Sequence, residues 1–67
     1  MIDTLLDHFR KLRNQTLEQD RLIDRLRIYI PDGDEDYFRL IEENKKLLKT
    51  LNELIAGTQK VKEKIDA

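Results

Sequence analysis

Apolar residues recur every seven positions along the second half of this 67-residue chain. One series has an aliphatic residue at every step and comprises Leu40, Leu47, Leu54 and Val61. A second series precedes it by three residues and comprises Tyr37, Asn44, Leu51 and Thr58, with Ile65 continuing it. Because two such series share one side of an α-helix, the pattern predicts a long helix that packs against other helices.

The first half of the chain shows the same heptad periodicity. Its members alternate steps of three and four residues and are Ile2, Leu5, Phe9, Leu12, Thr16, Gln19, Ile23, Leu26 and Ile30. Leu6 and Leu22 widen this apolar stripe on either side. The first half therefore predicts a second amphipathic helix of similar length.

A helix-breaking segment separates the two halves. Pro31 is the only proline and is followed closely by Gly33, one of two glycines. Proline cannot continue the preceding helix and biases Ile30 toward an extended conformation. Asp32 or Asp34 can then cap the next helix by accepting hydrogen bonds from its free backbone N–H groups. We therefore predict helices over about 3–30 and 34–65, with a turn at 31–34.

A link of about four residues requires the two helices to run antiparallel. The sequence thus predicts an all-α, antiparallel helical hairpin that forms a single domain over residues 1–67. When the two stripes are paired across the turn, they predict a hairpin core. The predicted core residues are Leu5, Phe9, Leu12, Ile23, Leu26, Leu40, Leu47, Leu51, Leu54 and Val61.

A further aliphatic series, Ile41, Leu48 and Ile55, runs beside the second heptad. It makes the apolar stripe wider than a two-stranded coiled coil requires. So short a chain, which has no cysteine for disulfides, usually needs a partner to complete its core. We therefore expect this series to form an oligomer interface, with two hairpins packing as a four-helix bundle in a closed dimer.

Polar residues interrupt both stripes at Thr16, Gln19 and Asn44. A polar residue in a helix–helix seam lowers stability but fixes register and oligomeric state. These three residues are therefore candidates for setting the register, and Asn44 is the best of them. The alternative is that they are weakly paired or solvated positions in a long seam.

Side chains suited to catalysis or to metal binding are scarce. The chain has no cysteine and no serine, and His8 is its only histidine. The acidic turn that starts at Asp32 has part of the spacing of a calcium-binding loop, but Tyr37 occupies the position that needs glycine. We interpret the acids as helix caps, and we expect no enzymatic activity, no cofactor and no bound metal.

The charges nearly cancel, with 13 basic and 14 acidic residues. Such a balance gives no bulk attraction to nucleic acid or to a membrane. No apolar run is long enough to span a bilayer, and the start lacks the features of a secretory signal, so we expect an intracellular, cytoplasmic location.

These features predict a protein–protein interaction or oligomerisation module, with a homodimer favoured. One alternative is an accessory subunit or small co-chaperone that folds with a heterologous helical protein. A second is a four-helix bundle that binds RNA through its basic residues.

Overall fold

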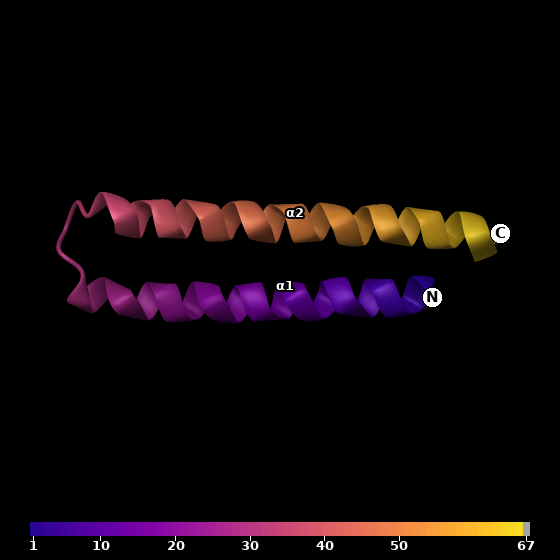
Figure 1. The fold of residues 1–67 in the computed structure, drawn as a ribbon, viewed down its shortest axis with the longest axis horizontal. Helices are drawn as coiled ribbons and strands as arrows, with labels where there is room; N and C mark the ends of the chain where they lie inside the picture. Colours follow the sequence, from indigo (N-terminus) through magenta and orange to yellow (C-terminus); the bar gives the residue numbers. More distant parts are fainter. Residues whose placement is uncertain (67) are drawn as a thin grey trace.

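The computed structural model describes residues 1–66 and folds them into two long helices that lie side by side (Figure 1). Helix α1 spans Ile2–Arg25, a 3₁₀ segment η1 spans Leu26–Tyr29, and helix α2 spans Glu35–Asp66. All the regular structure in the described range is helical, which confirms the predicted antiparallel hairpin. The molecule is a thin rod that measures 53 × 15 × 11 Å.

The first helix ends earlier than the sequence predicts. The α-helical part stops at Arg25, and the chain tightens into η1 before it reaches the turn. Ile30 is extended, with φ of −104° and ψ of 131°, as expected for a residue that precedes proline. A 3₁₀ turn is a common way for a helix to end because it satisfies carbonyl groups that the α-helix leaves free.

The turn and the start of α2 are built from two local features. Gly33 has a φ of 81°, a left-handed conformation that glycine adopts without a steric penalty. Asp34 then caps α2, because its Oδ1 accepts a hydrogen bond of 2.9 Å from the backbone N–H of Tyr37. Of the two predicted cap residues, the structure thus uses Asp34.

The helices meet along one seam, which we call the hairpin seam. On α1, its side chains are buried or partly buried and include Ile2, Leu6, Phe9, Thr16 and Ile23. On α2, they are Tyr37, Ile41, Asn44, Leu48, Leu51, Ile55 and Thr58. The deepest apolar side chains are Leu6 and Leu51, which are 3% and 4% exposed.

The structure corrects the predicted assignment of the apolar series. Leu40, Leu47, Leu54 and Val61, predicted as hairpin core, lie outside the seam and are 42–48% exposed. Leu5 and Leu26 on the first helix are exposed to a similar degree. Ile41, Leu48 and Ile55, predicted as the oligomer interface, face α1 instead, and Ile55 is only 6% exposed.

Helix geometry shows why the heptad allows this exchange. At 3.6 residues per turn, side chains four positions apart differ by about 40° around the helix axis, and those three apart by about 60°. The columns of Leu40 and Ile41 therefore flank the Tyr37 column at equal average angles, one on each side. A single neighbouring helix covers the central column and one flanking column, so the other flanking column is left at the side. The other predicted core residues, Phe9, Leu12, Ile23 and Leu51, are buried or partly buried.

Candidate interaction surface

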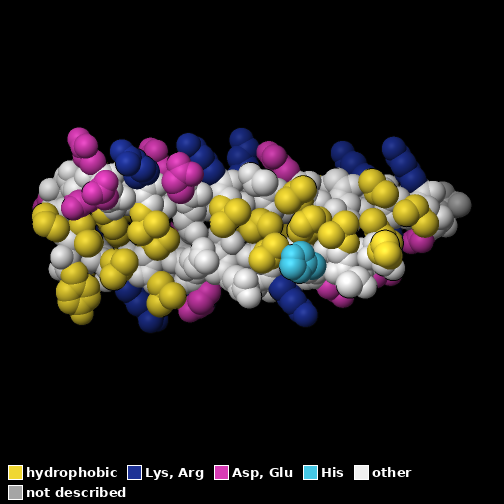
Figure 2. Space-filling view, in the orientation of Figure 1, with side chains coloured by type: hydrophobic (Ala, Val, Ile, Leu, Met, Phe, Trp, Pro, Cys, Tyr) yellow, Lys and Arg dark blue, Asp and Glu magenta, His cyan; other side chains and the backbone are white. Residues whose placement is uncertain are grey.

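Seven aliphatic side chains are partly exposed on the same side of the hairpin, along the line where its two helices meet (Figure 2). Each of them is 42–50% exposed. We call this set the open face, and it comprises Leu5, Leu22, Leu26, Leu40, Leu47, Leu54 and Val61. Contiguous apolar surface of this kind usually marks a site of interaction with another protein.

Two shallow grooves run along the open face, one toward each end of the rod. The groove near the turn has a volume of about 400 Å³ and is lined by apolar side chains of both helices, including Leu22, Leu26, Leu40 and Leu47. The groove near the chain ends has a volume of about 530 Å³ and includes Leu5, Leu54 and Val61. Each groove is therefore a concave, mostly apolar strip into which the side chains of another helix can pack.

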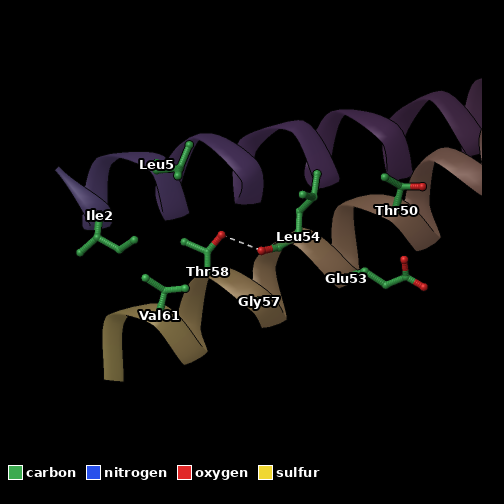
Figure 3. Close-up of a pocket in the computed structure, with 8 residues that line it drawn as sticks. All are labelled: Ile2, Leu5, Thr50, Glu53, Leu54, Gly57, Thr58 and Val61. Carbon is green, nitrogen blue, oxygen red and sulfur yellow. Dashed lines mark hydrogen bonds between the residues drawn. The ribbon is translucent and has the colours of Figure 1, made fainter. Parts of the chain in front are cut away.

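The groove near the chain ends is bordered by small residues of α2. In Figure 3, Ile2 and Leu5 project from α1 toward the same space as Leu54 and Val61 of α2. Gly57 lies on the rim of this groove, and a Cβ added there would meet nothing within 4 Å. The hydroxyl of Thr58 is not available to a partner, because it donates to the Leu54 carbonyl at 2.6 Å.

The side of the hairpin that carries Ile41 has a different character. The surface around Ile41 and Ile23 is lined by charged side chains of both helices, namely Asp20, Arg21, Asp24, Arg27 and Lys45. Such a surface is well solvated, so covering it with another protein would contribute little binding free energy. Along the rod the exposed leucines are thus concentrated on the open face, while Ile28, Tyr29 and Phe38 add exposed apolar surface near the turn.

Polar side chains inside the seam connect the two helices. The Asn44 side-chain amide donates to the backbone carbonyl of Thr16 over 3.4 Å, and both residues are buried. The Tyr37 hydroxyl donates to the carbonyl of Ile23 at 2.7 Å. The third predicted register residue, Gln19, is exposed and lies at the edge of the groove near the turn. The structure thus brings Asn44 and Thr16 together and leaves Gln19 outside the seam.

An ion pair joins the far ends of the two helices. The Lys62 ammonium lies 2.5 Å from a carboxylate oxygen of Asp3. Their hydrogen bond and mutual attraction lower the pKa of the Asp3 carboxyl and raise the pKa of the Lys62 amine. Asp3 is exposed and Lys62 is partly exposed, so this pair contributes little to stability.

Leu6, Tyr37 and Thr58 are seam residues that the predicted core omits. Tyr37 and Thr58 share a heptad series with Leu51, and that periodicity was the signal in the sequence that could have placed them in the seam. The four-residue spacing of Leu6 from Ile2 is no such signal, because Leu40 has the same spacing from Asn44.

The other ion pairs join residues of the same helix. Arg10 pairs with Asp7 at 3.8 Å, and Arg21 pairs with Glu18 at 3.6 Å. Lys46 lies 3.8 Å from Glu43 in the same way on α2. Within residues 1–66, no three histidine or carboxylate side chains gather closely enough to hold a metal ion.

The search for relatives found no match to a protein-family model, to a curated protein or to a solved structure. Neither helix of the described range is long and apolar enough to cross a bilayer. Any functional inference for this chain therefore depends on its own geometry.

Proposed function

We propose that this chain is a non-enzymatic protein–protein interaction module that self-associates through the open face. The observation that carries this proposal is the line of half-exposed aliphatic side chains that spans both helices. Packing two hairpins through this line gives a four-helix bundle, in which each helix contacts one helix of its own hairpin and one of the second copy. A closed dimer is the commonest assembly of this kind.

The exposed area of the hairpin supports an assembly of this size. The isolated hairpin exposes 5654 Å². A compact protein of 8.1 kDa would expose about 4,500 Å². The hairpin therefore has an excess of roughly 1,150 Å² over a compact protein of its mass. A stable protein interface removes about 800 Å² from each partner, so one two-fold interface would account for most of the excess.

The buried hydrogen bond between Asn44 and Thr16 supports a role in fixing the register of the helices. Asn44 occupies a heptad position that would bury an aliphatic side chain well, yet its amide reaches the Thr16 carbonyl across the seam. A buried asparagine lowers the stability of a helix bundle but penalises alignments that leave its amide without a partner. In this proposal, Asn44 fixes the register of the hairpin on which the open face is built.

The basic residues give less support to RNA binding. Four of the ion pairs join residues three positions apart on one helix, so the charges of Arg10, Arg21, Arg39 and Lys46 are already partly neutralised. Binding to a nucleic acid backbone depends on many unneutralised cations in register with the phosphates. A heterologous helical partner remains the second use of the open face, and the experiment below distinguishes it from self-association.

The proposal is tested by sedimentation equilibrium of the parent chain and of Leu47→Asp over a series of concentrations. We expect the parent to sediment with twice the mass of the chain. A charge at the centre of the open face should shift the Leu47→Asp variant to the mass of the monomer, since burying an unpaired carboxylate is strongly unfavourable.

Leu17→Asp is the matched control. Leu17 is 42% exposed, close to the 45% of Leu47, but it lines neither groove of the open face. This variant should keep the mass of the parent. A monomeric parent would refute self-association and direct the search toward a heterologous helical partner. Equal loss of the dimer in both variants would show that the open face is not the interface.

A further inference from the structure

The open face has two edges of different composition. The α1 edge consists of Met1, His8, Gln15 and Leu22, which recur every seven residues and carry no charged side chain when His8 is neutral. The α2 edge consists of Glu43, Thr50, Gly57 and Lys64, with charged residues at its ends and small residues between them. Met1 and His8 border a depression beside Leu5, whereas Thr50 and Gly57 border the groove beside Leu54.

The register of the hairpin sets which residues of the two edges lie level with each other. Leu22 and Glu43 border the same groove, so they lie at similar heights along the rod. Leu5 and Val61 border the groove near the chain ends, and Leu26 and Leu40 border the groove near the turn. The middle of the open face therefore falls near Gln15 on α1 and near Thr50 on α2.

A second copy can cover the open face with two-fold symmetry in two ways. If the symmetry axis runs along the rod, both turns lie at the same end and α1 packs against α2 of the partner; we call this arrangement parallel. If the axis runs across the rod, the turns lie at opposite ends and each helix packs against its own counterpart in the antiparallel direction; we call this arrangement head to tail. Both arrangements cover the same aliphatic line, so the two edges decide between them.

The parallel arrangement matches the edges poorly. It places Leu22 of one copy beside Glu43 of the partner subunit, because these residues lie at similar heights in the hairpin. Leu22 is 50% exposed, and covering it would also remove water from the Glu43 carboxylate, whose pairing with Lys46 at 3.8 Å is itself exposed to solvent. The symmetry repeats this unfavourable contact on the other side of the dimer.

We infer that the second copy binds head to tail, with α1 against α1 and α2 against α2, an inference that rests on the self-association proposed above. Leu22 then packs beside His8 of the partner subunit, which joins two edges without charged side chains. Glu43 lies beside the partner's Gly57. Because Gly57 has no side chain, the Glu43 carboxylate stays in contact with water.

The small residues of the α2 edge favour the same arrangement. At the middle of the dimer, Thr50 faces Thr50 of the partner subunit, and Gly57 lies one heptad further along the same edge. The distance between two packed helices depends on the size of the side chains at their contact, so small residues here permit close approach of the two α2 helices. The leucines of both α2 helices can then interdigitate along their full length.

The absence of cysteine makes this arrangement directly testable. Gln15→Cys and Thr50→Cys each place a single thiol at the middle of one edge, on an exposed residue. Each variant is treated with a short bis-maleimide cross-linker, alone and as an equimolar mixture, and the products are analysed by denaturing electrophoresis. Asn14→Cys, on an exposed residue away from the open face, measures cross-linking by random collision.

The head-to-tail dimer predicts that Gln15→Cys and Thr50→Cys each cross-link efficiently with themselves, well above the Asn14→Cys background. The parallel dimer predicts the reverse, because only the mixture would then bring Gln15→Cys beside Thr50→Cys. Cross-linking in the mixture alone, or in none of the samples, overturns the head-to-tail arrangement. Sedimentation of the same variants distinguishes failure of the head-to-tail arrangement from failure of self-association. A dimer that cross-links only in the mixture refutes the head-to-tail arrangement alone. A monomer refutes self-association as well.

Discussion

Tyr37 combines two functions at the end of the seam nearest the turn. Its ring is buried, with 9% of the residue exposed, and its hydroxyl reaches across to the Ile23 carbonyl on the other helix. The backbone N–H of the same residue is held by Asp34. A single residue therefore joins the cap of α2 to the last turns of α1.

Removing this hydroxyl should weaken the hairpin without disturbing its packing. We expect Tyr37→Phe to lower the free energy of unfolding by about 1 kcal/mol, the net contribution of a typical hydrogen bond. Urea unfolding followed by circular dichroism measures this change. Tyr29→Phe is the control, since Tyr29 is 77% exposed and should tolerate the substitution. Equal stability of Tyr37→Phe and the parent would show that this hydrogen bond contributes nothing.

Neighbouring residues show what the sequence can and cannot determine. The heptad correctly indicates that Leu47 and Leu48 both belong to one apolar stripe on α2. It does not determine which of them faces α1, because both columns fit the same periodicity and the choice depends on how far α2 is rotated about its axis. In the structure the column of Ile41, Leu48 and Ile55 faces α1, which buries Ile55 and leaves Leu54 at the side.

The helices and the turn were more predictable than the rotation of each helix about its own axis. Pro31 and Gly33 mark the turn, and the two helices follow from periodicity on either side of it. The conversion of Leu26–Tyr29 to a 3₁₀ segment was not predicted. Its residues are compatible with an α-helix, and the tightening arises from the way the chain must enter the turn.

The two glycines should respond in opposite ways to the same substitution. Gly33→Ala should destabilise the hairpin by about 1 kcal/mol, because its φ of 81° is unfavourable for a residue with a Cβ. Gly57→Ala should stabilise α2 by a similar amount of about 1 kcal/mol, since alanine is the better helix former and its Cβ would meet no other atom. Thermal unfolding at a fixed low concentration, where dimers dissociate, measures both changes. A destabilised Gly57→Ala variant under these conditions would show that the helix does not accept a side chain there.

The whole molecule is too thin to bury more than the single seam between its two helices. Its radius of gyration is 15.8 Å, against about 11 Å for a compact chain of this length. Both helices therefore keep one apolar column in contact with solvent. Self-association through the open face would convert two such rods into one bundle with a closed interior.

Substitutions at two adjacent leucines can distinguish loss of folding from loss of the dimer. Leu48→Asp places a charge in the hairpin seam, and we expect it to abolish most of the helicity, because replacing a seam leucine costs about 3 kcal/mol or more. Leu47→Asp should retain more helix at the same concentration while losing the dimer. Far-UV circular dichroism and sedimentation on the same samples measure both effects. Greater loss of helix in Leu47→Asp than in Leu48→Asp would contradict the observed rotation of α2.

The position of the two chain ends has a consequence for anything joined to this module. Both ends lie at the pole of the rod opposite the turn (Figure 1). A domain fused to either end would therefore leave from that single pole. In a head-to-tail dimer, two fused domains would be held at opposite poles, separated by a distance close to the 53 Å length of the hairpin. The bundle would then act as a rigid spacer that keeps the two fused domains apart, whereas a parallel dimer would bring them close together.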